Sequence, residues 1–293
     1  MSNGNGHNAS AILSNDLVLI DLDVSVWGAR KALTPEDLDK KPSEIPDIYY
    51  LGHKTLVPKE SLKQGRALEG RGRSVLERYG FRFPIGMTRA VPVAVLPEVE
   101  AALEEVKQEF EAWADTFETD FPALKEATIA EHGEELRPLY PDAATVRSKF
   151  RFDWVIVNVS VPEGNSENAA KVKAKIESWV DEIAVEFRQT AAEVFDTVTK
   201  KLERGEMVTE FSFNAVRRAI DRLRAINFLN DQTVEAQLAK AKEALSKFSA
   251  EGCRTDPLVR ESARAALTTV VKEIKNVGDV NEITGGFKRK LRI

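Results

Sequence analysis

Two carboxylates, Asp21 and Asp23, lie two residues apart in the run DLVLIDLDVSVW, which covers residues 16–27. In a β-strand this spacing places both side chains on one face, about 7 Å apart. Paired carboxylates can bind a divalent cation or divide the acid and base roles of a reaction. A metal site needs more ligands, which Asp37 and Asp39 could supply in space. We favour a simpler interpretation, a solvated strand face whose charges oppose strand-to-strand aggregation.

The other residues with reactive side chains form no catalytic pattern. The single cysteine, Cys253, has no CxxC partner, and no GxSxG motif is present. The histidines show no zinc-ligand spacing: His7, His53 and His132. The sequence therefore predicts no catalytic, cofactor-binding or metal-binding residues and no cofactor. A metal-dependent enzyme centred on the two carboxylates is a third alternative.

Three glycines in GRALEGRGRS, namely Gly65, Gly70 and Gly72, superficially resemble a phosphate-binding loop. No GK[ST] follows them, and no apolar strand runs directly into them, so both common nucleotide-binding patterns fail. We interpret the segment as part of a helix over 59–79 that the glycines weaken.

The same region is strongly basic within an acidic protein of net charge −5. Residues 54–89 hold nine Lys and Arg residues against three Glu residues, whereas residues 98–135 are dominated by Glu and Asp. A basic patch can bind phosphates, with Tyr79 and Phe81 available to stack on bases. We favour complementary pairing of the two segments, within one subunit or between neighbours. The candidate anion or subunit contacts are Arg66, Arg71, Arg73, Arg78 and Arg82.

Five further residues are candidates for a protein interface. Tryptophan and arginine are enriched at contact hot spots, which draws attention to Trp27 and to the basic pair Arg30 and Lys31, although a tryptophan at a strand end is more often core. Trp179 and Phe187 lie on the apolar stripe of a long predicted helix, where they serve either the core or an intersubunit surface.

Secondary structure in the first half is mixed. Alternating apolar residues predict strands at 17–26 and 150–161, and the prolines of FRFPIGMTRAVPVAVLP predict an extended or turn-like chain. Thr34-Pro35-Glu36-Asp37 has the form of a capping box that starts a short helix. A helix should run from Pro97 to about Phe117, followed by a second helix and a proline-broken loop within 118–148.

The second half is nearly all helix. Apolar residues recur every three or four positions over 172–202, over 213–248 and over 257–274. A cap or a bend is expected at Asn230-Asp231, and a helix start at Asp256-Pro257. At 1.5 Å per residue the first two stripes are each roughly 50 Å long, which suits a helical hairpin.

Composition limits the class of protein. A single cysteine excludes an intrachain disulfide and fits a reducing cytoplasm. No window approaches the roughly 18 apolar residues of a membrane span, and the start MSNGNGHNASAILSND has no signal-peptide pattern.

The opening segment carries a resemblance. The strand LIDLDVSVWGARK is followed by LTPEDL, then by a basic helix ending LERYGFRF and by AVPVAVLPEV. This arrangement, over roughly residues 14–160, resembles a domain-of-unknown-function family of phage and mobile-element proteins. The family is often encoded near MoxR-type AAA+ ATPases and von Willebrand factor A-type proteins. The resemblance implies such an origin, and work beside an ATPase or in an assembly, but carries over no functional residues.

The sequence thus predicts a mainly α fold with a small α+β part and a long helical hairpin or bundle in the C-terminal half. We expect a disordered arm over 1–15, a mixed α+β domain over 16–162, a long-helix bundle over 163–278 and a basic tail over 279–293. The favoured function is a non-enzymatic, self-associating structural or adaptor protein, located in the bacterial cytoplasm or the virion. The alternative is a nucleic-acid-associated phage or plasmid protein that uses the basic 54–89 segment.

Overall fold

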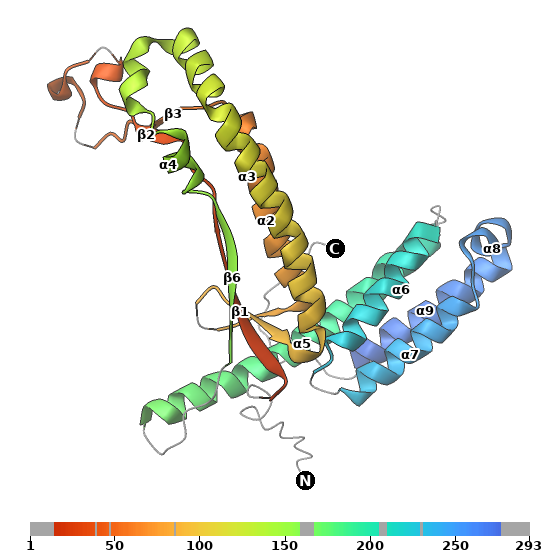
Figure 1. Ribbon diagram of the computed structural model, residues 1–293. Coiled ribbons are helices and arrows are strands. Elements are labelled where there is room, and N and C mark those ends of the chain that lie inside the picture. The colour runs from red at the N-terminus through yellow and green to blue at the C-terminus, as the bar shows by residue number, and fades with distance from the viewer. Residues whose placement is uncertain are drawn as a thin grey trace. The chain divides into compact units, whose positions relative to one another are not determined.

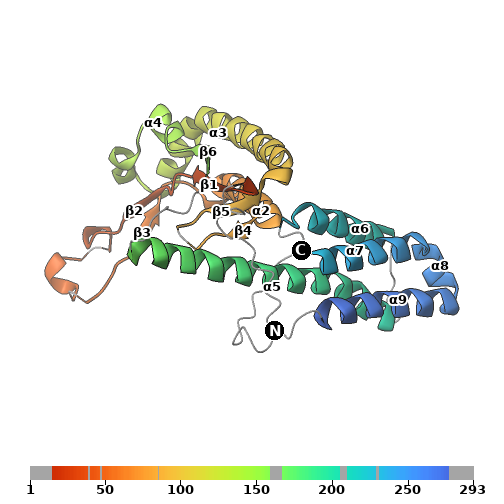
Figure 2. The same ribbon diagram turned by 90° about the horizontal axis from the view of Figure 1, so that it is seen from below.

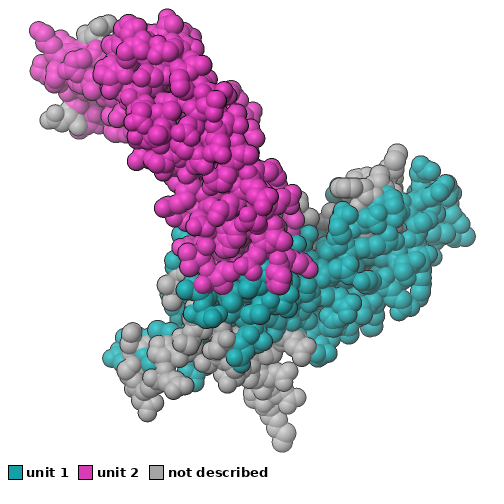
Figure 3. All heavy atoms as spheres, in the orientation of Figure 1, with its two compact units in different colours: residues 1–19, 79–96, 157–293 teal, residues 20–78, 97–156 magenta. Residues whose placement is uncertain are grey.

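The computed structural model describes residues 15–38, 40–46, 48–84, 86–158, 167–204, 210–228 and 231–276. The chain divides into two compact units, coloured separately in Figure 3: unit 1 contains residues 1–19, 79–96 and 157–293, and unit 2 contains residues 20–78 and 97–156. The fold is mainly α with a small α+β part, as predicted (Figure 1). No helix in the described ranges is long and apolar enough to cross a membrane. Nearly all of the expected arm and the whole of the expected tail lie outside these ranges.

The larger sheet has the strand order β4-β5-β1-β6. Its strands are β1 (Leu17–Ser25), β4 (Phe81–Arg82), β5 (Arg89–Pro92) and β6 (Arg151–Val157). β4 and β5 pair antiparallel, with Phe81 opposite Ala90. The predicted strands at β1 and β6 are confirmed, and so is the extended chain that forms β4 and β5. β1 is an inner strand, and its first four residues are all buried.

A smaller sheet in unit 2 pairs β2 (Arg30–Ala32) antiparallel with β3 (His53–Thr55). The connection between them contains two short 3-10 helices, η1 (Glu36–Leu38) and η2 (Pro42–Glu44). The first is the short helix predicted from Thr34-Pro35-Glu36-Asp37. The backbone N–H of Thr34 donates to Asp37 Oδ2 at 2.8 Å, which is the side-chain half of a capping box.

Glycines let α2 (Lys63–Tyr79) pack closely in unit 2, after the 3-10 helix η3 (Lys59–Leu62). A Cβ atom on Gly65 would overlap the ring of Trp113, and one on Gly72 would lie 2.6 Å from Cζ of Phe152. A Cβ on Gly70 would meet nothing within 4 Å. At two of the three glycines the absence of a side chain therefore leaves room for an aromatic ring. This close packing explains the presence of glycine in a helix better than a phosphate-binding loop does.

A single helix, α3 (Leu96–His132), follows the 3-10 helix η4 (Val93–Val95) and continues through Pro122. The prediction of two helices separated near residue 118 was wrong. Pro122 removes one N–H donor from the helix, but its side chain is exposed, so the freed carbonyl of Glu118 is not forced into an apolar core. Phe117, Phe121 and Ile129 are buried on both sides of the proline and hold the two parts in one line.

The core of unit 2 is aromatic. Trp113 lies 4.9 Å from Phe150 between ring centroids, and Phe117 lies 5.2 Å from the same ring. The chain returns from α3 to the sheet through the 3-10 helix η5 (Glu134–Leu139) and through α4 (Ala143–Arg147), which Asp142 caps. The ring cluster consists of Phe110, Trp113, Phe117, Phe121, Tyr140, Phe150 and Phe152.

Unit 1 contains a bundle in which α5 packs on α6, α6 on α7, α7 on α9 and α9 on α5 (Figure 2). The helices are α5 (Glu167–Glu203), α6 (Glu210–Ala225), α7 (Gln232–Ser246), α8 (Ala250–Thr255) and α9 (Pro257–Asn276). The expected helix over 172–202 and the start at Asp256-Pro257 are confirmed. The expectation that 213–248 forms one element of roughly 50 Å was wrong, because the stripe is divided between the shorter helices α6 and α7. The expected cap is present, since Asp231 Oδ1 caps α7 by accepting from the Val234 N–H at 3.1 Å.

The β4–β5 hairpin belongs to the same unit as α5. The indole Nε1 of Trp179 donates to the carbonyl oxygen of Arg82 at 2.7 Å, and its ring lies edge-on to Phe83 at 5.1 Å. Trp179 and Phe187 are buried at 4% and 3% exposure, with other stripe residues such as Ile176 and Ile183. Burial within unit 1 favours the core role for this stripe.

Candidate protein-contact surface

The carboxylate pair on β1 faces solvent. Asp23 forms an ion pair at 2.6 Å with Arg151 on the neighbouring strand β6, and both side chains are at least half exposed. Asp21 is exposed as well. Within the described residues, no group of three or more His, Cys, Asp and Glu side chains is placed to hold a metal ion. The arrangement agrees with a charged strand face.

The basic segment is partly neutralised inside unit 2. Arg71 on α2 pairs with Glu109 on α3 at 2.5 Å, and Arg73 pairs with Glu69 on its own helix at 2.9 Å. The bond from Glu109 raises the pKa of the Arg71 guanidinium. The side chains of Arg66, Arg78 and Arg82 are exposed. The predicted complementarity of the basic and acidic segments thus operates within one subunit at Arg71.

Acidic side chains of α3 have further partners in unit 2. Arg147 on α4 contacts Glu111 and lies 2.8 Å from Asp115. Arg137 binds both oxygens of Glu126, at 2.7 and 3.0 Å. These bonds connect α3 to the segments that follow it, and they lower the pKa of Glu126.

The interface candidates have different environments. Trp27 is half-buried, with its ring edge-on to Phe121 at 5.5 Å, so it contributes to the core of unit 2. The next turn of the chain contains Ala29 in the left-handed region at φ 48°. Beyond it, Arg30 and Lys31 on β2 are both exposed.

Cys253 and the two described histidines, His53 and His132, each lie close to other groups of the protein. Cys253 is buried, and burial raises the pKa of its thiol. His132 lies 3.8 Å from Glu131. His53 lies within 3.3 Å of the Tyr50 hydroxyl. His7 lies outside the described residues.

An exposed apolar group in the β2–β3 connection was not predicted from the sequence. Four large side chains make up what we call the 38–50 patch, with exposed fractions of 44% for Leu38, 87% for Ile48, 64% for Tyr49 and 79% for Tyr50. The prolines and the glycine of SEIPDIYYLG predict only an ordered connection. The available signal was three consecutive large side chains, Ile-Tyr-Tyr, in a segment too short and too interrupted to form an element that buries them.

The loop that carries the 38–50 patch is held by hydrogen bonds and an ion pair where it joins β2 and β3. The Leu33 N–H donates to the carbonyl oxygen of Gly52 at 3.1 Å, next to the paired strands β2 and β3. Lys54 on β3 binds Asp37 Oδ1 at 2.5 Å, and both side chains are about four-fifths buried. The Lys54 ammonium holds the pKa of the Asp37 carboxyl below its usual value. The apolar side chains are therefore presented by an anchored loop.

Charged side chains of both signs are exposed in the same part of the chain as the patch. Arg30 and Lys31 are exposed on β2, and Glu36, Lys41 and Glu44 are exposed in the β2–β3 connection. An apolar centre with a polar rim is the usual composition of a protein contact surface, and tyrosine contributes large contact area with few rotatable bonds.

A family model described as a protein of unknown function, DUF3150, matches residues 14–272. No curated protein and no solved structure matches the chain.

Proposed function

The chain belongs to the DUF3150 family, and from that premise we propose that it is a non-enzymatic, self-associating structural or adaptor protein that acts through its surfaces. The observation that carries this proposal is the 38–50 patch. Leu38, Ile48, Tyr49 and Tyr50 expose large apolar side chains within thirteen residues of an anchored loop.

Four large apolar side chains exposed within one short loop favour a contact with another protein molecule, because exposed apolar residues accompanied by polar ones mark interaction sites. The base of the loop is already ordered by the Lys54–Asp37 ion pair and the β2–β3 pairing. Binding then needs little further ordering of the chain, which preserves affinity.

The mixed rim suits a second copy of the same chain. A two-fold contact brings the same surface of both subunits together, so it needs both signs of charge on one patch. Arg30, Lys31 and Lys41 can oppose Glu36 and Glu44 of the partner copy.

The resemblance to phage and mobile-element proteins extends the proposal. It favours a bacterial cytoplasmic or virion location, and an AAA+ ATPase or a von Willebrand factor A-type protein as a further partner. A purified ATPase of this type should co-sediment with the chain, and Ile48→Asp should reduce the bound fraction if the patch serves as an adaptor.

The nucleic-acid alternative rests on the exposed arginines of the basic segment. Arg66 and Arg78 on α2 extend into solvent and are available to phosphates. If they bind nucleic acid, the purified chain should show a raised 260/280 nm absorbance ratio. Arg66→Glu with Arg78→Glu should then remove binding to labelled DNA while leaving self-association unchanged.

Sedimentation equilibrium of the full chain tests the proposed function. We expect Ile48→Asp and Tyr50→Asp each to raise the dissociation constant of self-association by about tenfold or more, since hot-spot truncations cost 2 kcal/mol or more. Leu258→Asp is the matched control, because Leu258 is 79% exposed on α9 of unit 1. A monomeric wild-type chain at micromolar concentration, or equal weakening by the control, would contradict the proposal.

A further inference from the structure

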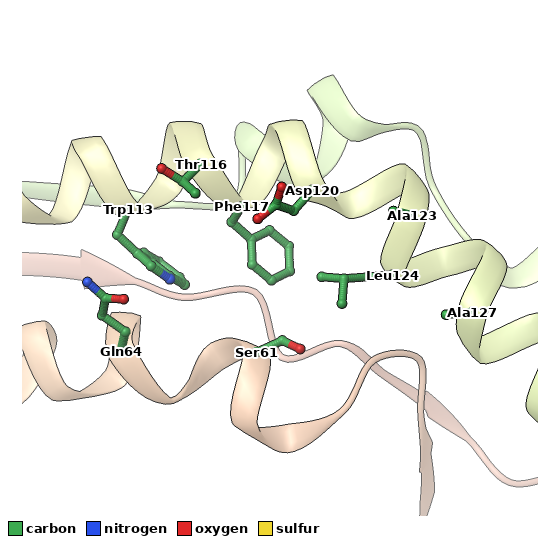
Figure 4. A pocket seen from close by; sticks show the side chains of 9 residues that line it. All are labelled: Ser61, Gln64, Trp113, Thr116, Phe117, Asp120, Ala123, Leu124 and Ala127. Carbon is green, nitrogen blue, oxygen red and sulfur yellow. The ribbon is translucent and has the colours of Figure 1, made fainter.

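A groove runs along α3 of unit 2, separate from the 38–50 patch, with a volume of about 550 Å³ (Figure 4). One wall comes from η3 and the start of α2, where Ser61 and Gln64 lie, and the other side is a stripe of α3 from Trp113 to Ala127. These fourteen residue steps correspond to about 21 Å of helix. The groove has the length of a short peptide.

The floor of the groove is apolar. Phe117 and Leu124 point into it from α3 (Figure 4), and the small side chains of exposed Ala123 and Ala127 complete the lining. Burying apolar side chains against such a floor contributes roughly 25 cal/mol for each Å² removed from water.

An indole N–H supplies a directed contact. Trp113 is 7% exposed, and its ring is fixed against Gly65. Among the described residues its nitrogen has no hydrogen-bond acceptor, in contrast to Trp179, which donates to Arg82. Figure 4 shows the nitrogen on the side of the ring nearer Phe117 and Ser61. A peptide carbonyl in the groove would accept a hydrogen bond from this N–H.

A carboxylate supplies the electrostatic contact. Asp120 is the charged side chain in the groove lining, it is exposed, and no cation pairs with it in the described part of the chain. Other acids of α3, including Glu109 and Glu126, already pair with arginines of unit 2. The groove therefore selects a ligand with apolar side chains, a free backbone carbonyl and a Lys or Arg residue.

The chain itself contains a segment of this chemistry. Residues 287–293, FKRKLRI, place Phe287, Arg289, Leu291 and Ile293 at odd positions, and the segment carries four basic residues in all. In an extended conformation the six steps from 287 to 293 would span about 20 Å, which equals the length of the groove. The segment lies outside the described residues.

We propose that the groove of one copy binds residues 287–293 of a second copy, a statement that rests on the proposed self-association. Phe287 and Leu291 occupy the floor, a backbone carbonyl accepts from Trp113, and a basic side chain pairs with Asp120. Such a contact joins two different surfaces, so it is head-to-tail and builds rings or filaments. Salt should weaken this contact, because dissolved ions screen the attraction between exposed charges. The Debye length that describes this screening is about 10 Å at 0.1 M salt.

A charge-swap cycle on the full chain tests the contact. Asp120→Lys should raise the dissociation constant of self-association about tenfold, and Arg289→Glu should do the same. Combining the variants in one chain should restore the dissociation constant to within about threefold of the wild-type value, because the reversed charges attract each other again. Asp21→Lys makes the same charge change on β1, outside the groove, and should leave the constant unchanged.

A steric variant and a peptide separate this inference from the proposed function. Ala123→Trp fills the groove at an exposed helix position without changing charge, and should weaken self-association while the thermal unfolding midpoint stays the same. A fluorescein-labelled peptide of residues 285–293 is titrated into the full chain carrying Arg289→Glu. Its anisotropy should rise, and Asp120→Lys should abolish the rise.

The outcomes are distinct. If the wild type self-associates while Asp120→Lys and Ala123→Trp have no effect and the peptide does not bind, this inference fails and the proposed function stands. If Ile48→Asp also has no effect, neither surface is the interface. A wild type that stays monomeric yet binds the peptide in an Asp120-dependent way overturns the second-copy contact and the proposed self-association together.

Discussion

The cores of the two units are built on different principles. In unit 1 the buried residues follow helical stripes, such as Ile176, Ile183 and Phe187 on α5, and each helix meets its neighbours through one periodic face. In unit 2 the core is a cluster of aromatic rings contributed by α3, β6 and the loop before it, with α2 fitted onto them at Gly65 and Gly72. The contacts of the bundle are spread along its periodic faces, whereas the aromatic core includes close fits at individual residues such as Gly65 and Gly72.

Trp179→Ala tests the periodic core and should have the largest effect. The substitution removes a buried ring and leaves the Arg82 carbonyl without its donor, so unit 1 should lose about 3–5 kcal/mol of unfolding free energy. Phe187→Ala should lose a similar amount. Urea titration followed by circular dichroism measures the change. Unchanged midpoints combined with lost self-association would instead place the stripe between subunits.

Alanine substitutions along α2 test the close fits of unit 2. Gly65→Ala and Gly72→Ala should each cost about 1–3 kcal/mol, because the new methyl group forces Trp113 or Phe152 to move. Gly70→Ala is the matched control in the same helix. Its methyl group meets open space, so it should stabilise the unit by up to about 1 kcal/mol. Equal effects at all three positions would show that helix propensity, and not packing against the aromatic rings, determines the change in unfolding free energy.

The anchored loop should respond to acid. The pKa of Asp37 is lowered from 3.8 by its bond to Lys54, so the stabilisation is present above pH 3.8 and is lost as the pH falls through the lowered value. Limited proteolysis of residues 33–52 as a function of pH measures this loss. Asp37→Asn should make the loop equally sensitive at all pH values. Acid-induced cleavage that persists in this variant would point to another group.

The strand face of β1 should show the smallest effect. Asp21→Asn should change the unfolding free energy by less than about 0.5 kcal/mol, as is usual for surface changes. Asp23→Asn removes an exposed pair with Arg151, and such pairs contribute about 0–1 kcal/mol. Chemical denaturation measures both. A tightly bound divalent ion that only the double variant loses would restore the metal-site hypothesis.

The candidate sites could be predicted only in part. The complementarity between the basic and acidic segments follows from composition, but the sequence did not identify Arg71 as the residue that reaches Glu109. The two residues are 38 positions apart, and their contact depends on how α2 lies against α3. The 38–50 patch was missed because a short loop has no period from which burial can be inferred.

The sequence by itself determined the elements whose signals are local. The apolar stripe of α5, the start of α9 at Pro257 and the extended chain around Pro84 and Pro92 all follow from patterns within a few residues. Only the tertiary structure decided that α3 continues through Pro122, that Gly65 and Gly72 leave room for aromatic rings, and that Ile48 and Tyr50 face solvent. Each of these depends on which distant side chain lies opposite, because burial of Phe117 and Phe121, and not local propensity, compensates for a proline in a helix.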